Sequence, residues 1–280
     1  LREPLNGGFR ALVRYINESG ATVVSIDMPS GMFSDWDRQA PARDIIKANL
    51  TLAVQFPHIC FFIPEKAELI GRWKVLDIGL SREAADKIKT GFHLVEASEV
   101  KSLLRQRDPF CSKADFGSAL LIAGRYGMVG ASVLAARGAL RSGVGKVTVY
   151  GPQCAYQTVQ TAVPEAMFEA DDNKLMINDI HPTRQYSAYG IGPGIGTADN
   201  TLNAIDTFIR SAKTPLVIDA DALNCIARRP ELLNHIPMLS VLTPHDGEFD
   251  RLFGEHTTHE ARLKKALEVS KYYNLLILLK

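Results

Sequence analysis

Ser118-Ala-Leu-Leu-Ile-Ala123 is an apolar run that ends in a glycine-rich turn, Gly124-Arg-Tyr-Gly-Met-Val-Gly130. Residues 131–141 follow and are rich in alanine, and after Gly143 comes a second short run at 146–150. Short apolar or β-branched runs between turns predict strands, and the longer segment between them predicts a helix. Strand, turn, helix and strand form one βαβ unit, which implies a parallel sheet covered by helices.

The same alternation extends in both directions along the chain. Towards the C-terminus, the sequence predicts strands at 187–191, 215–218, 239–242 and 275–279, a helix near 199–211, and further helices after the loops that follow the second and third of these strands. Towards the N-terminus, it predicts a helix at 8–18 ended by Gly20, a buried strand at 23–26, and strands at 50–56 and 73–78. Residues 81–112 are polar and contain no clear strand. We therefore expect two α/β domains, 1–95 and 96–280.

The composition excludes several classes of protein. The 280 residues carry a net charge of +1, so no basic excess points to nucleic acid and no acidic tail to a solvating segment. No apolar stretch reaches the length of about 18 residues that a membrane span needs. Cys60, Cys111, Cys154 and Cys225 are widely spaced and form no CxxC pair. We expect reduced thiols in a cytoplasmic protein that binds neither nucleic acid nor membrane.

Four loops that follow predicted strands carry unusual residues, namely 124–130, 192–196, 219–224 and 243–248. Ligands of open parallel sheets bind at the carboxyl ends of the strands, and these loops converge on that edge. The first two loops are rich in glycine, which lets backbone N–H groups approach a ligand closely. The alternative for both is a tight turn that binds nothing.

The other two loops are polar. Asp219-Ala-Asp221-Ala-Leu-Asn224 can orient a hydroxyl, a ribose or a magnesium–phosphate group, although Asp221 would also serve as a helix cap. Thr243-Pro-His245-Asp-Gly-Glu248 combines residue types that seldom serve packing alone. The alternative for this loop is a helix capped by Asp246 or Thr243 with Glu248 in its first turn.

Taken together, these stretches resemble the ADP/ATP-dependent NAD(P)H-hydrate dehydratase family. The matching segments are Phe116-Gly-Ser-Ala-Leu-Leu-Ile-Ala-Gly124, Gly130-Ala-Ser-Val-Leu-Ala-Ala, Ala139-Leu-Arg-Ser-Gly-Val-Gly145, Gly192-Pro-Gly-Ile-Gly196, Val217-Ile-Asp-Ala-Asp-Ala-Leu-Asn224 and Leu242-Thr-Pro-His-Asp-Gly-Glu-Phe249. They cover about 113–280 in the family's order. The resemblance implies a ribokinase-like parallel-sheet domain.

The resemblance also implies a reaction and a site. The family removes water from the hydrates of NADH and NADPH, and uses ADP or ATP, with Mg²⁺ expected, to make the hydroxyl a leaving group. By resemblance, Gly130, Ala131, Gly192, Gly194 and His245 line the hydrate site. Lys280 matches the lysine that opens the family's nucleotide segment, and we expect Asp219 and Asn224 to bind the nucleotide as well.

The first third of the chain resembles the end of the NAD(P)H-hydrate epimerase domain, which is Rossmann-like. The matching segments are Ile26-Asp-Met-Pro-Ser-Gly31, Ala48-Asn-Leu-Thr51 and Val75-Leu-Asp-Ile-Gly79. By resemblance, Asp27 contacts the hydrate and Ser30 helps to bind K⁺. The alternative is an ordinary proline turn. The expected protein is thus a ribokinase-like domain preceded by part of a Rossmann-like α/β domain.

The chain departs from the two families at three places. The epimerase's asparagine- and glycine-rich loop is expected before residue 1, and the dehydratase's glycine-rich turn with its catalytic aspartate after residue 280, so both ends look like cuts. The family's His-Lys-Gly before the first strand reads Ser112-Lys-Ala114. Two other functions stay open, a ribokinase-type small-molecule kinase and a non-catalytic nucleotide-binding regulator. We expect a homo-oligomer.

Overall fold

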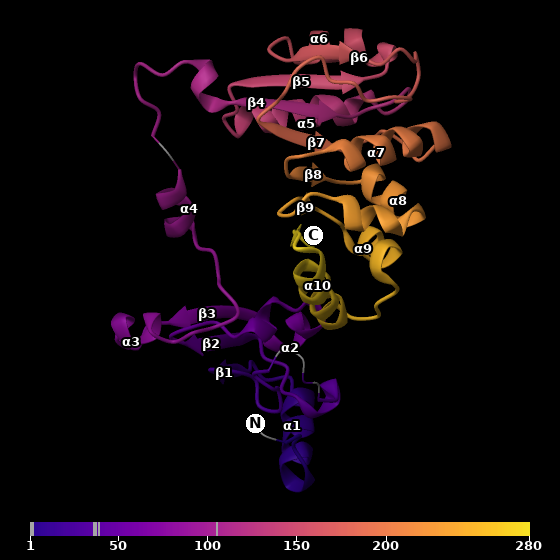
Figure 1. Cartoon of the computed structure of the whole chain (residues 1–280). Helices are drawn as coiled ribbons and strands as arrows, with labels where there is room; N and C mark the ends of the chain where they lie inside the picture. The colour runs from indigo at the N-terminus through magenta and orange to yellow at the C-terminus, as the bar shows by residue number, and fades with distance from the viewer. Residues whose placement is uncertain (1–2, 36–37, 39, 105) are drawn as a thin grey trace. The chain divides into compact units, whose positions relative to one another are not determined.

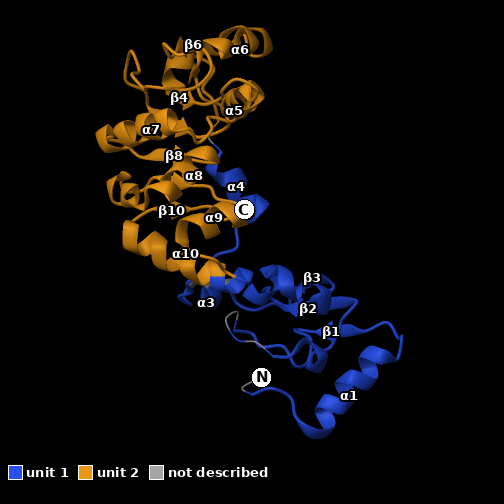
Figure 2. Ribbon diagram, turned by 90° about the vertical axis from the view of Figure 1, so that its right-hand side faces the viewer, with its two compact units in different colours: residues 1–105, 257–261 blue, residues 106–256, 262–280 orange. Residues whose placement is uncertain are grey.

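The computed structural model describes residues 3–35, 38, 40–104 and 106–280. The chain separates into two compact units, one of residues 1–105 with 257–261 and one of residues 106–256 with 262–280 (Figure 2). The separation falls after residue 105, within the polar stretch, whereas the sequence analysis sets the boundary between residues 95 and 96.

A parallel three-stranded sheet in the order β1-β2-β3 is the frame of the first unit (Figure 1). The elements of this part of the chain are α1 (Gly7–Glu18), β1 (Val24–Ile26), η1 (Ala42–Asp44), β2 (Leu50–Val54), η2 (Ile59–Phe62), η3 (Pro64–Lys66), α2 (Ala67–Ile70), β3 (Arg72–Leu76), α3 (Arg82–Asp86) and α4 (Ala97–Leu103). The predicted first helix and three strands are confirmed. Parallel strands joined by long crossovers also confirm the α/β class of this segment.

The prediction that the first strand is buried is wrong. Only Ser25 of β1 is buried, whereas Val24 and Ile26 are 50% and 74% exposed. β1 is an edge strand that pairs with β2 alone, and side chains two residues apart point to the same face of a sheet. The described part of the first unit leaves that face open at Val24 and Ile26. Its core lies instead around Ala53, with Ile45 and Phe61.

The second unit is built on a parallel seven-stranded sheet in the order β10-β9-β8-β7-β4-β5-β6 (Figure 1). Its elements are η4 (Lys113–Phe116), β4 (Ser118–Ile122), α5 (Val129–Arg141), β5 (Lys146–Gly151), η5 (Gln153–Ala155), α6 (Tyr156–Ala162), β6 (Met167–Ala170), β7 (Ala188–Ile191), α7 (Asp199–Ser211), β8 (Leu216–Ile218), α8 (Asp221–Arg228), η6 (Pro230–His235), β9 (Val241–Leu242), α9 (Asp246–Phe253), α10 (His259–Tyr273) and β10 (Leu276–Ile277). The parallel α/β prediction is confirmed, while α6, β6 and α10 were not predicted. None of the described helices combines the length and the apolar character needed to cross a membrane.

The strand order creates a switch point beside β4. From β4 the chain adds β5 and β6 on one side of the sheet, and then returns to add β7 on the other. The loops that leave β4 and β7 therefore start at neighbouring strand ends and lead in different directions, which opens a crevice at the carboxyl edge. The glycine-rich loops 124–130 and 192–196 are the two loops of this switch point.

Apolar side chains bury both faces of this sheet. On one face, Ile122 and Ile218 pack in a single cluster with Ile205 of α7. On the other face, Val147 and Val149 of β5 form a cluster with helices α5 and α6. Because both faces are covered, the central strands read as apolar runs rather than as alternating patterns.

The burial of Ile205 predicts a large effect of truncation. Ile205 is completely buried in α7, so Ile205→Ala should lower the free energy of unfolding by about 2–5 kcal/mol through lost burial and a residual cavity. Leu134 of α5 is 71% exposed, and Leu134→Ala should change stability by less than about 0.5 kcal/mol. Chemical unfolding should be followed by far-ultraviolet circular dichroism, because Trp36 and Trp73 both precede the second unit. Equal effects of the two substitutions would contradict the assigned core.

Candidate functional site

The loops that follow β4, β7 and β8 contact one another mainly through backbone atoms. The N–H of Gly124 donates to the carbonyl oxygen of Pro193 at 2.8 Å. Gly192 has a φ of +130°, and a Cβ there would lie 1.8 Å from the carbonyl oxygen of Asp219. A Cβ on Gly194 would lie 2.8 Å from the Cβ of Ala131. No side chain fits at either glycine, so the predicted residues Ala131, Gly192 and Gly194 lie together because of this close packing.

Gly130 lies in the first turn of α5 and is exposed. A Cβ at this position would meet nothing within 4 Å, so packing does not require glycine here. The N-cap of α5, Met128, offers no side-chain hydrogen bond to the helix. The first turn of α5 therefore presents backbone N–H groups and the positive end of the helix dipole at the carboxyl edge, an arrangement suited to an anion.

Asp221 connects two loops and does not cap its helix. The N-cap of α8 is Ala220, which adopts φ 51° and ψ −121° and makes no side-chain cap. Asp221 is the first residue of α8, and its Oδ2 accepts a hydrogen bond of 2.8 Å from the N–H of Gly196. The alternative that Asp221 serves as a helix cap is therefore wrong. A non-glycine residue at positive φ costs about 1–3 kcal/mol, and such strain clusters at functional sites.

Lys280 and Asp219 form an ion pair at the same edge. The Lys280 Nζ lies 2.8 Å from the Asp219 Oδ1, and the Lys280 N–H donates to the carbonyl oxygen of Pro244 at 3.0 Å. Burial raises the pKa of the Asp219 carboxyl, but hydrogen bonds from Lys280 and Thr243 outweigh it, so that the pKa lies below its ordinary value. Asn224, also predicted to bind nucleotide, accepts a hydrogen bond of 2.8 Å from the Arg251 Nη1 through its Oδ1.

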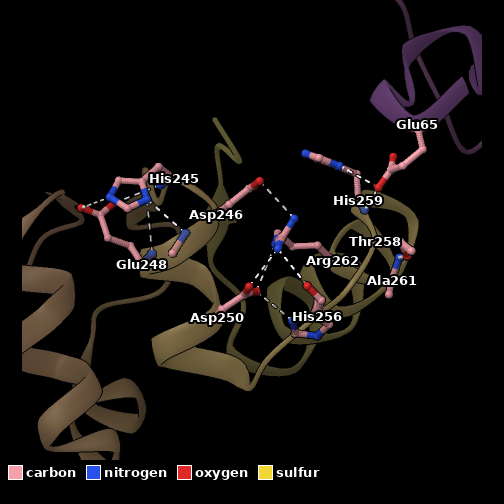
Figure 3. Close-up of polar contacts among 11 residues, drawn as sticks. Glu65, His245, Asp246, Glu248, Asp250, His256, Thr258, His259, Ala261 and Arg262 are labelled. Atoms are coloured by element: carbon pink, nitrogen blue, oxygen red, sulfur yellow. Dashed lines mark hydrogen bonds and ion pairs between the residues drawn. The ribbon is translucent and has the colours of Figure 1, made fainter. Parts of the chain in front are cut away.

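His245 caps α9 (Figure 3). Its Nδ1 accepts hydrogen bonds from the N–H groups of Gly247 at 3.1 Å and Glu248 at 3.4 Å, and the buried Glu248 carboxylate accepts from the His245 N–H at 2.9 Å. The loop is thus a capped helix, but the predicted caps Asp246 and Thr243 are wrong. Histidine is not among the common capping residues, and only the glutamate three positions later signals this box. Because Nδ1 accepts, the proton of the neutral ring is on Nε2, which lies 3.2 Å from the Glu248 Oε1.

Arg262 of α10 binds two aspartates of α9 (Figure 3). Arg262 is 6% exposed, and its guanidinium reaches both oxygens of Asp250, at 3.0 Å and 2.8 Å, as well as Asp246 at 3.1 Å. The hydrogen bonds from Arg262 outweigh burial and, together with a contact from His256, lower the pKa of Asp250 to about 2. The helix that positions His245 is therefore held by charge-assisted hydrogen bonds through Asp246 and Asp250.

A cavity of about 370 Å³ lies at the loops that follow β4, β7 and β8, and its lining includes Arg125, Met128, Met176, Gly196 and Asp221. Arg125 is not among the predicted site residues, because one arginine between two glycines carries no chemical signature by itself. Ser112, where the family has histidine, caps η4 in a capping box with Asp115. That contact explains the serine as a local structural residue.

In the first unit, Asp27 and Ser30 lie in one loop after β1. Asp27 has a φ of 67°, and its Oδ1 lies 3.2 Å from the His58 Nε2 and accepts from the Val54 N–H at 3.3 Å. The Ser30 carbonyl oxygen accepts from the Ile46 N–H at 2.9 Å. Within the described residues, no group of three or more His, Cys, Asp and Glu side chains is arranged around a metal. The roles of Asp27 and Ser30 stay predictions.

Removal of the lysine should raise the pKa of Asp219. In Lys280→Met, the carboxylate stays partly buried but loses its closest cation, so its pKa should increase relative to the parent protein. The measurement is a pH titration of the side-chain carboxyl carbon by NMR. Lys271→Met, an exposed substitution on α10, is the control and should leave the titration unchanged. An unchanged pKa in Lys280→Met would disprove the ion pair.

The Asp250–Arg262 contact predicts an acid dependence of stability. A carboxyl with a lowered folded-state pKa contributes stability above its unfolded pKa of about 4, and the contribution disappears as the pH falls towards about 2. Asp250→Asn should therefore be less stable than the parent at neutral pH, by an amount that shrinks below pH about 4. Urea midpoints at several pH values measure this difference. A difference that is constant with pH would exclude the contact as its source.

Comparisons with known proteins identify the families to which this chain is related. Residues 119–280 match the family described as NAD(P)H-hydrate dehydratase, and residues 1–60 match the family described as YjeF-related protein N-terminus. Among curated relatives, the bifunctional NAD(P)H-hydrate repair enzyme Nnr of Salinibacter ruber is 31% identical over the whole chain, and that of Moorella thermoacetica is 30% identical over 96% of it. The chain spans 53% and 52% of the lengths of these two relatives.

Solved structures give the same relationship. The ADP/ATP-dependent NAD(P)H-hydrate dehydratase of Bacillus subtilis, co-crystallized with ATP and Mg²⁺, has a TM-score of 0.53 and 31% identity, covering 65% of this chain and 64% of its own. A ribokinase-like superfamily protein of Enterococcus faecalis, with a TM-score of 0.52, 21% identity and coverage of 62% of this chain and 61% of its own, shares the fold. The match over 119–280, which is more than half of the chain, places this chain in the NAD(P)H-hydrate dehydratase family.

Proposed function

We propose that this chain belongs to a metabolite-repair enzyme that removes water from (S)-NADH hydrate and (S)-NADPH hydrate in a reaction dependent on ADP or ATP. Residues 96–280 are the dehydratase domain in this proposal, and residues 1–95 are part of an NAD(P)H-hydrate epimerase domain. The observation that carries it is the convergence of the residues that the family resemblance assigns. Ala131 touches the position of Gly194, and Lys280 pairs with Asp219, all at the carboxyl edge of one sheet.

The proposed chemistry transfers a phosphoryl group to the hydroxyl of the hydrated ring. The carbon–oxygen bond then breaks, phosphate leaves, and the neighbouring carbon loses a proton, which restores the ring double bond. Atoms balance because the water of the hydrate ends in the released phosphate. This route replaces hydroxide, a poor leaving group, by phosphate.

The residues of the edge fit these tasks. Backbone N–H groups of α5 face the edge, and a Cβ at Gly127 or Gly130 would meet nothing within 4 Å, so the start of this helix is open to a ligand. The imidazole of His245 has its Nδ1 occupied by helix capping and its Nε2 3.2 Å from the Glu248 Oε1, so a polar group of the substrate that binds at Nε2 would replace or share that contact.

Nucleotide binding requires an exchange of partners. Lys280 is paired with Asp219, and Asn224 with Arg251. When a nucleotide phosphate binds the Lys280 ammonium, the Asp219 carboxylate becomes available to a cation, and carboxylate oxygens are ligands that Mg²⁺ prefers. Asp219 and Asn224 would hold the ion, which neutralises charge on the transferred phosphoryl group. In the epimerase segment, Ser30 is the proposed ligand of K⁺. The enzyme is further proposed to act in the cytoplasm and to form a homo-oligomer.

The direct test is recovery of NADH or NADPH absorbance from the purified hydrates with Mg²⁺ and ADP or ATP. His245→Asn keeps a good helix cap but removes the imidazole, so it should lower kcat/KM by about tenfold or more while the melting temperature stays close to that of the parent. His181→Ala, at a surface ion pair with 76% side-chain exposure, is the matched control and should retain full activity.

Two outcomes would decide against the proposed reaction, and a third would decide against the role of His245. Phosphate transfer to a small alcohol without NADH recovery would identify a ribokinase-type kinase. Nucleotide binding without turnover would identify a regulator. Full activity of His245→Asn would remove His245 from the substrate site, although the reaction itself would stand.

A further inference from the structure

The 370 Å³ cavity lies next to the proposed hydrate site and contains none of the residues assigned to it. It opens between the loops that follow β4 and β7, so it occupies the switch point of the sheet. Met128, one of its walls, lies 3.3 Å from the Cβ position of Gly194, and Ala131 lies 2.8 Å from that same position. A ligand bound at Ala131 and Gly194 would therefore reach the cavity with its remote part.

Arg125 provides the cation of this cavity. Its side chain lies over the bare backbone of Gly196, where a Cβ would come within 2.8 Å of the arginine Cδ. The guanidinium donates to the carbonyl oxygen of Tyr126 at 3.2 Å and lies 3.5 Å from the Met128 sulfur. Among the residues that the structure describes, no carboxylate forms an ion pair with Arg125, and Asp221, which lines the same cavity, accepts a hydrogen bond from the Gly196 N–H instead. Planar guanidinium groups with spare donors are well suited to phosphate.

The other walls favour a nucleoside. Met128 and Met176 are flexible, polarizable side chains that pack well against aromatic rings. Asp221 also lines the cavity, and a carboxylate beside a bound dinucleotide accepts hydrogen bonds from ribose hydroxyls. The volume of about 370 Å³ lies in the range of about 300–1,000 Å³ that small-molecule sites occupy.

We propose that this cavity binds the adenylate half of the dinucleotide hydrate, with Arg125 on one of its phosphates. The proposal rests on the proposed function, because it takes the hydrate as the substrate. The shared chemistry is an adenosine phosphate, which the dinucleotide and the separate ADP or ATP both carry. The dinucleotide is favoured because the cavity adjoins Ala131 and Gly194, whereas the nucleotide lysine, Lys280, pairs with Asp219.

The kinetic test compares dinucleotide hydrates with the hydrate of reduced nicotinamide mononucleotide, which lacks the adenylate. Arg125→Gln should raise KM for NADH hydrate and NADPH hydrate about tenfold and leave kcat/KM for the mononucleotide hydrate unchanged. Met176→Glu, which adds a negative charge to the cavity, should act in the same direction. Arg141→Gln, an exposed substitution at the end of α5, is the control.

A binding test works without turnover. ADP-ribose, titrated into the protein by calorimetry, should bind about tenfold more weakly to Arg125→Gln and with unchanged affinity to Lys280→Gln. The reverse pattern would assign the cavity's ligand to the separate nucleotide and overturn the proposal. Equal losses for dinucleotide and mononucleotide hydrates, or no loss with Arg125→Gln, would also overturn it. Absence of dehydration with every hydrate, together with retained Arg125-dependent ADP-ribose binding, would refute the proposed function and leave an adenylate site.

Discussion

The close approach of backbone to backbone at Gly192 is the constraint on which the candidate site depends. A side chain there would begin 1.8 Å from the Asp219 carbonyl oxygen, so the β7 and β8 loops touch only because Gly192 has none. Directly after Asp219, Ala220 adopts a positive φ of 51°. The next residue, Asp221, begins α8 and accepts a hydrogen bond from the N–H of Gly196. The side chain of Arg125 lies over this same glycine. The charged side chains at this edge, Asp221 and Arg125, thus lie on loops that pack against one another through backbone atoms.

Much of the fold could be predicted from the sequence, because periodicity and turn residues are local signals. The α7 helix has the predicted limits, since its apolar residues repeat at helical spacing and polar residues flank them. The elements α6, β6 and α10 were not predicted. α6 follows its strand through a short 3-10 turn, and α10 has many charged residues and a weak apolar pattern. The burial of β1 was mispredicted because β-branched residues signal a strand but do not report which face is covered.

The candidate site was predicted less completely, for physical reasons. Glycines at strand ends indicate a close approach, so the loops could be named, and the structure brings Ala131, Gly192 and Gly194 together. The partners of the polar residues depend on contacts between loops far apart in sequence. Asp221 bonds to Gly196 across 25 residues, and Lys280 to Asp219 across 61. Arg125 could be assigned to a binding site only after the structure placed it in the lining of a cavity. Local sequence does not encode such distances.

In both units a residue at positive φ lies at the end of a strand; in the first unit it is an aspartate, and in the second it directly follows one. Asp27 has a φ of 67° directly after β1, and Ala220 has a φ of 51° directly after Asp219. Each conformation costs about 1–3 kcal/mol and persists only where neighbouring contacts enforce it. Asp27 is held by the bond of 2.8 Å from its own N–H to the Leu52 carbonyl oxygen, and Asp219, the residue before Ala220, is held by the bond of 3.0 Å from its N–H to the Ile191 carbonyl oxygen. In each case a bond to an adjacent strand holds the carboxylate before any ligand arrives. Pre-organised carboxylates lose little freedom on binding, which accounts for strain at these two places.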